Sequence, residues 1–101
     1  MNTTGYIREI TNFIDFEKYI EAADKFGELC FGLCSENIEI SKTEQAKIEE
    51  FGAFIFEKVA DLPEVDFLPL IIADLQEYKK GLLLTGIKKL MKNTEFLDSL
   101  L

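Results

Sequence analysis

The segment Phe16–Cys34 has the strongest periodic pattern in the chain. Its apolar residues recur at alternating steps of three and four, and its charged residues fall on the opposite side. The members of the apolar stripe are Phe16, Tyr19, Ala23, Phe26, Cys30 and Leu33. This pattern is typical of an amphipathic helix with one buried face, here about five turns long. Such a helix needs other elements to cover its stripe, and the remaining periodic segments are further helices.

The clearest helix start lies in the middle of the chain, where Glu44 follows Ser41 by three residues. This spacing is the pattern of a capping box, in which each side chain accepts a hydrogen bond from the other residue's backbone N–H. We expect the helix that starts there to run to about Asp61. Its middle, Phe51–Phe56, is apolar nearly all round, which predicts burial on more than one side.

The second half of the chain predicts one kinked helix or two separate ones. Asp66 is expected to cap a helix with Pro69 in its first turn. Lys79–Gly81 favours a break, because cations suit the carboxyl end of a helix and glycine readily adopts a left-handed conformation. Residues 81–92 form a last amphipathic run.

These segments predict an all-α fold, a compact antiparallel helical bundle of four main helices plus short terminal helices. At the amino-terminal end, residues 5–14 form a short helix and Asp15 caps the long helix that follows. No linker divides the chain, so residues 1–101 are expected to form a single domain. The predicted core contains Phe16, Ile20, Phe26, Phe51, Ile55, Ile71 and Leu75.

Residues suited to catalysis are scarce. The chain contains no His, the commonest general base and transition-metal ligand, and no glycine-rich phosphate-binding loop. Cys30 and Cys34 share one helix face, but two thiolates complete only half of a tetrahedral metal site. Their Cβ atoms are expected about 5–6 Å apart, beyond the usual ~4.5 Å limit for a disulfide. We therefore expect both to be core residues, and the protein to be neither an enzyme nor a binder of cofactors or metals.

The net charge of −8 argues against direct binding to nucleic acid, which depends on clustered Lys and Arg. Residues 81–92 resemble a membrane-surface peptide, with Lys on one face and Leu and Ile on the other, but a docked terminal helix has the same pattern. Anionic lipid would repel the acidic remainder of the chain, so membrane contact is not expected. Met1–Thr4 is polar and no apolar run follows a basic start, which favours a cytoplasmic location.

Two apolar residues do not fit the buried faces of their helices. Phe31 falls on the charged side of its helix, where Gly32 exposes backbone beside it and Glu17, Asp24 and Glu28 are placed to form part of a polar ring around it. Leu70 falls on the side of Asp74 and Glu77. We expect both to contact a partner, although single exposed hydrophobic residues are ordinary. The alternative for Phe31 is that the amino-terminal helix folds over it.

The remaining candidate contacts are acidic. Glu49, Glu50, Glu57, Asp61, Glu64 and Asp66 are expected to meet a basic surface on a partner protein. Opposite charge on the two surfaces speeds encounter and sets specificity. A nucleic-acid-binding protein is a natural partner for such a surface.

The favoured function is therefore that of a small acidic protein-binding module of the inhibitor, immunity or adaptor type. The alternative is a self-associating assembly component, chaperone-like, for example of a phage or secretion system, in which residues 79–92 meet the acidic body of another copy. A short, acidic, His-free helical chain is similar in size and composition to immunity proteins, phage-encoded inhibitors and phage assembly chaperones. No motif assigns it to a family.

Overall fold

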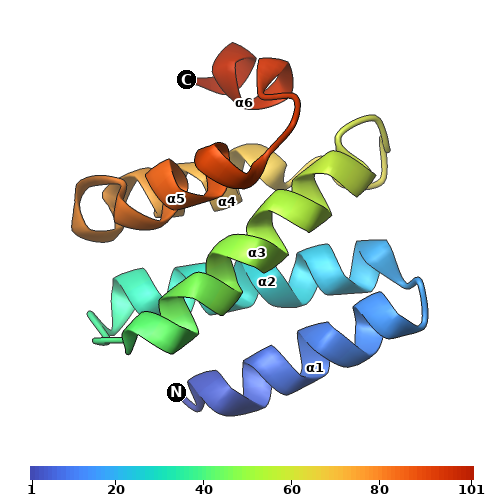
Figure 1. Ribbon diagram of the computed structural model, residues 1–101. Coiled ribbons are helices and arrows are strands. Elements are labelled where there is room, and N and C mark those ends of the chain that lie inside the picture. Colours follow the sequence, from blue (N-terminus) through green and yellow to red (C-terminus); the bar gives the residue numbers. More distant parts are fainter.

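The computed structural model describes residues 1–101 and contains helices and turns but no strand (Figure 1). The helices are α1 (Thr3–Asp15), α2 (Tyr19–Ser35), α3 (Lys42–Val59), α4 (Leu68–Glu77), the 3₁₀ turn η1 (Tyr78–Lys80), α5 (Leu82–Leu90) and α6 (Glu95–Leu100). The predicted all-α fold is confirmed. None of these helices combines the length and the apolar character that crossing a membrane requires.

Four helices form the body of the molecule. α2 and α5 each pack against both α3 and α4, and these four contacts close a ring around the core. In Figure 1, α3 and α5 form the front layer, with α2 and α4 behind them. α1 runs antiparallel to α2 and packs along it, while α6 contacts α4 at the carboxyl-terminal end.

The core is one cluster of 23 buried hydrophobic residues to which every α-helix contributes. Of the predicted core residues, Phe26, Phe51, Ile55, Ile71 and Leu75 are buried in it, as expected. The ring of Phe26 meets that of Phe56 edge to face, with centroids 6.0 Å apart. α2 and α3 are therefore joined by aromatic packing at the centre of the molecule.

The core prediction was wrong for Phe16 and Ile20, whose exposed fractions are 76% and 37%. The cause is the joint between α1 and α2. The backbone N–H of Phe16 still bonds to α1, and Glu17 then adopts a left-handed φ of 58°. Because α2 begins only at Tyr19, Phe16 lies outside its buried stripe and Ile20 lies at its open end.

The capping box of α3 is confirmed, but two other predicted caps are wrong. Ser41 and Glu44 exchange side-chain to backbone hydrogen bonds, each 3.1 Å long. Asp15 is instead the last residue of α1. Asp66 lies outside α4, because the carbonyl of Phe67 accepts the first helical hydrogen bonds at 3.0 and 3.3 Å.

The predicted break at Lys79–Gly81 is confirmed, and it separates α4 from α5. Three successive residues adopt left-handed conformations there, with φ of 45° at Lys79, 59° at Lys80 and 85° at Gly81. The Tyr78 hydroxyl donates a 2.8 Å hydrogen bond to the Ile38 carbonyl, which anchors the break to the loop between α2 and α3.

Candidate protein-binding groove

Phe31 and Leu70 lie in one groove on the surface, between α2 and α4. We call it the α2–α4 groove; it has a volume of about 310 Å³ and is lined by Asp24, Gly27, Glu28, Phe31, Phe67, Leu70, Ile71 and Asp74. Phe31 is 63% exposed and Leu70 is 70% exposed, the two largest exposed fractions among the large hydrophobic residues after Phe16. The structure therefore brings together two residues that the sequence singled out separately.

Each wall of the groove is one helical stripe. The lining residues of α2 are Asp24, Gly27, Glu28 and Phe31, and those contributed by α4 and the residue before it are Phe67, Leu70, Ile71 and Asp74. In each set, the four residues are separated by three, one and three positions along the chain, and this spacing places them on one face of their helix. Both stripes run beside a buried face, and this places them at the surface along the seam of the two helices.

The floor of the groove depends on Gly27. A Cβ atom at this position would lie 3.1 Å from two carbon atoms of Ile71, which is itself almost fully buried. α2 and α4 thus approach closely at Gly27, and Phe31 and Leu70 stand on either side of the seam.

The groove is acidic as well as apolar. Asp24, Glu28 and Asp74 line it and no basic residue does. Glu28 is paired with Lys25 at 3.1 Å, whereas Asp24 and Asp74 form no ion pair. Desolvation raises the pKa of Asp74, and the nearby charge of Glu77 raises it further. A cation placed beside Asp74 would stabilise its carboxylate.

A second hollow continues the groove toward the amino-terminal end of α2. We call it the α1–α2 hollow; it is lined by Phe13, Ile20, Glu21, Asp24, Lys25, Glu28 and Phe67, and its volume is about 550 Å³. The two hollows share Asp24, Glu28 and Phe67. They therefore form one trough along α2, with exposed apolar residues at both ends.

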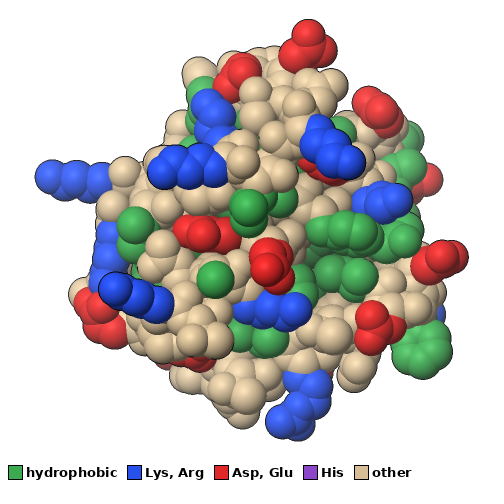
Figure 2. All heavy atoms as spheres, viewed as in Figure 1, with side chains coloured by type: hydrophobic (Ala, Val, Ile, Leu, Met, Phe, Trp, Pro, Cys, Tyr) green, Lys and Arg blue, Asp and Glu red, His purple; other side chains and the backbone are tan.

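None of the six predicted acidic contacts lines the α2–α4 groove. On α3, Glu49 accepts a 3.1 Å hydrogen bond from Gln45, and Glu50 is paired with Lys47 at 3.7 Å. The face formed by α3 and α5 shows acidic and basic side chains interspersed, with no continuous acidic patch (Figure 2).

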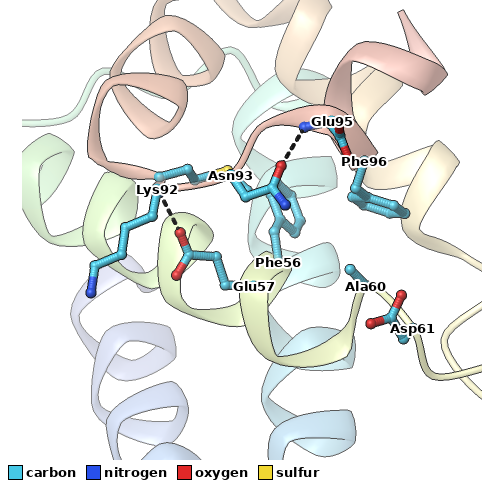
Figure 3. A pocket seen from close by; sticks show the side chains of 9 residues that line it. Phe56, Glu57, Ala60, Asp61, Lys92, Asn93, Glu95 and Phe96 are labelled. Atoms are coloured by element: carbon cyan, nitrogen blue, oxygen red, sulfur yellow. Dashed lines mark hydrogen bonds between the residues drawn. The ribbon is translucent and has the colours of Figure 1, made fainter.

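The other predicted acids follow along α3 and the turn after it. Glu57 accepts a 2.6 Å hydrogen bond from the backbone N–H of Lys92 and holds the α5–α6 link against α3 (Figure 3). Glu57 and Asp61 line a further hollow between α3 and the α5–α6 link, together with Phe56 and Phe96 (Figure 3). Glu64 and Asp66 are exposed in the turn that leads to α4. Three of the six acids therefore have bonds within the chain, and the other three remain free.

The amino terminus covers a neighbour of Phe31 but leaves Phe31 exposed. Gly32 was expected to expose its backbone, and this was wrong because the residue is buried. Glu17 was expected in the polar ring around Phe31, and this was also wrong, because Glu17 lies in the turn before α2 and does not line the groove. A Cβ atom at Gly32 would lie 2.8 Å from the sulfur of Met1, which shows that the Met1 side chain lies on this glycine.

The two cysteines are packing residues. Cys30 is buried, and the half-buried Cys34 donates a 3.0 Å hydrogen bond from its thiol to the Asp74 carbonyl. Desolvation raises the pKa of both thiols, which keeps them protonated and poorly nucleophilic. No group of three or more Cys, Asp or Glu side chains is arranged to hold a metal ion.

Comparison with known proteins gives no match to a protein family, to a curated protein or to a solved structure. The groove is therefore interpreted from its own chemistry. It offers exposed apolar side chains with carboxylates around them, which suits the binding of another protein.

Proposed function

We propose that this chain is a small, acidic, non-catalytic protein-binding module of the inhibitor or adaptor type. It binds a basic surface of a partner protein through the α2–α4 groove. The single observation that carries the proposal is the exposure of Phe31 and Leu70 in one groove lined by three acids and no base.

The physical reason is the combination of apolar anchors with a charged rim. Burying an exposed Phe or Leu side chain contributes roughly 1.5–3 kcal/mol. Interfaces typically place such anchors at the centre and polar groups around them. The unpaired carboxylates of Asp24 and Asp74 favour a basic partner and disfavour an acidic one, because like charges facing each other across an interface repel.

The proposal is tested by comparing wild type with Phe31→Ala and Phe16→Ala as immobilised bait in an extract of the protein's own cells. Phe16 is the matched control, because it is an exposed aromatic residue that lines neither hollow. A partner is then purified and its dissociation constant measured with each variant. We expect Phe31→Ala to weaken its binding by about tenfold or more and Phe16→Ala to leave it unchanged.

A partner with a basic contact surface and this dependence on Phe31 would support the proposal. If no protein depends on Phe31 for its retention, the α2–α4 groove is not a binding site for a partner protein.

A second surface favours self-association as the alternative function. Leu82 and Leu90 are exposed on α5, and both line a hollow that contains three bases, Lys79, Lys80 and Lys89, and one acid, Glu49. Lys80 and Lys89 form no ion pair, and basic side chains gather around α5 at the left of Figure 2. This basic, partly apolar face is complementary to the acidic groove of another copy.

Sedimentation velocity in low and high salt tests this alternative. Opposite charges hold such copies together, so the assembly is expected to dissociate as salt shortens the Debye length from about 30 Å at 0.01 M to about 3 Å at 1 M. Lys89→Glu is expected to abolish it at low salt. A monomer at every salt concentration would exclude self-association through this face.

A further inference from the structure

We infer that the occupant of the groove is a basic amphipathic α-helix of about three turns, lying along α2. This inference rests on the proposed function of the α2–α4 groove, and it specifies the shape and chemistry of the partner segment.

The length of the trough sets the length of the occupant. Its apolar ends on α2 are Ile20, in the α1–α2 hollow, and Phe31, in the α2–α4 groove. At a rise of 1.5 Å per residue, the eleven-residue step between them spans about 16 Å, which corresponds to about three turns of a helix. The shared lining residues Asp24, Glu28 and Phe67 make the trough continuous over this distance.

The backbone of the walls favours a helix over an extended segment. Both walls are helical, and the chain has no strand whose edge could pair with an extended peptide. An extended segment pressed into the trough would lose water from backbone groups without gaining protein partners for them. A helix satisfies those groups internally and presents side chains alone.

The placement of apolar side chains predicts the pattern of the occupant. Ile20 and Phe31 stand on α2, and Phe67 and Leu70 stand on the opposite wall. A helix lying between the walls contacts both ends of the trough if its apolar residues recur at i, i+3 or i+4, and i+7.

The charges predict what flanks that apolar stripe. Glu21, Asp24 and Glu28 lie along α2, and Asp74 faces them from α4. Lys25 is the only base in the trough, and it is paired with both Glu9, at 3.2 Å, and Glu28, at 3.1 Å. Lys or Arg on both sides of the occupant's stripe would therefore meet carboxylates on both walls.

Three synthetic peptides of about 14 residues, long enough for the trough, test the inference. The first is a Leu/Lys peptide with Leu at helical spacing. The second has the same composition with Leu and Lys alternating, a period that suits a strand. The third repeats the first with Glu in place of Lys. Fluorescence anisotropy measures the dissociation constants, and far-ultraviolet circular dichroism measures the helix gained on binding.

We expect the helical basic peptide to bind at least about tenfold more tightly than either of the others, with a gain of helix. Phe31→Ala and Leu70→Ala should each weaken it by about tenfold, and Phe16→Ala should not. Asp24→Lys should weaken it more than Glu64→Lys, a matched variant with the same net charge whose changed residue lies outside the trough.

Three failures are distinguishable. If the alternating peptide binds as tightly as the helical one and still depends on Phe31 and Leu70, the occupant is not a helix, although the groove remains a protein-binding site. If no peptide depends on these two residues, both the inference and the proposed function of the groove are wrong. If the fraction of peptide bound falls as the protein concentration rises, a second copy of the chain competes with the peptide for the trough. This result would overturn the inference and identify the second copy as the occupant.

Discussion

Phe26→Ala is expected to lower the free energy of unfolding by about 3–5 kcal/mol, whereas Phe31→Ala should leave it nearly unchanged. Phe26 has no exposed surface, and its ring packs edge to face on Phe56. Its truncation removes a large buried group and leaves a cavity between α2 and α3. Phe31 lies on the same helix and is 63% exposed, so its truncation removes little buried surface.

Urea denaturation followed by circular dichroism measures both variants, with the slope m checked for constancy. The pair is well matched, because the same side chain is truncated in the same helix at two levels of burial. Equal destabilisation would mean that Phe31 is buried in solution. The proposed contact at the α2–α4 groove would then be lost as well.

The sequence predicted the helices well because their periodic segments are long and their breaks are strong. The capping box at Ser41 and the break at Gly81 depend on local backbone chemistry, which a sequence shows directly. The predicted burial of Phe16 was wrong because the position of this residue depends on the turn at Glu17, where a non-glycine residue adopts a positive φ. Such a conformation is uncommon for residues other than Gly or Asn, and no residue pattern in this segment predicts it.

The groove was predictable only in part. The sequence marked Phe31 and Leu70 as misplaced apolar residues, and it placed Asp24 and Glu28 beside Phe31. The spacing of Phe67, Leu70 and Asp74 also marks a second stripe on α4, which was a usable signal. The pairing of the two walls was not predictable, since it depends on the close approach of α2 and α4 at Gly27.

The predicted acidic contacts show a second limit of prediction from the sequence. Counting acids on the outer side of α3 does not reveal which of them bond within the chain. Glu57 bonds to a backbone N–H that is 35 positions away in the sequence, and the Glu49 carboxylate lies against Gly86 of α5. Tertiary contacts of this kind remove carboxylates from a surface that the sequence presents as free.

Gly52→Leu is expected to destabilise the protein by about 3 kcal/mol, at the upper end of the usual overpacking costs. Gly52 lies on α3 where it meets α5. A Cβ atom there would lie 2.8 Å from Cγ1 of Ile87 and 3.1 Å from the ring of Phe26. Both neighbours are fully buried, so neither can move aside into solvent. The substitution therefore forces α3 and α5 apart. The resulting loss of stability exceeds the roughly 1 kcal/mol by which replacing a helical glycine stabilises a helix.

A double-mutant cycle with Ile87→Ala identifies the contact responsible. Ile87→Ala alone is expected to cost about 2–5 kcal/mol as a core truncation. In the double variant the side chain introduced by Gly52→Leu occupies the space that Ile87 leaves, so the combined loss of stability should fall below the sum of the two single losses by about 0.5–3 kcal/mol. If the losses of stability in the two single variants are instead additive, the side chains at positions 52 and 87 do not compete for the same space. The close α3–α5 contact at Gly52 would then be absent in solution.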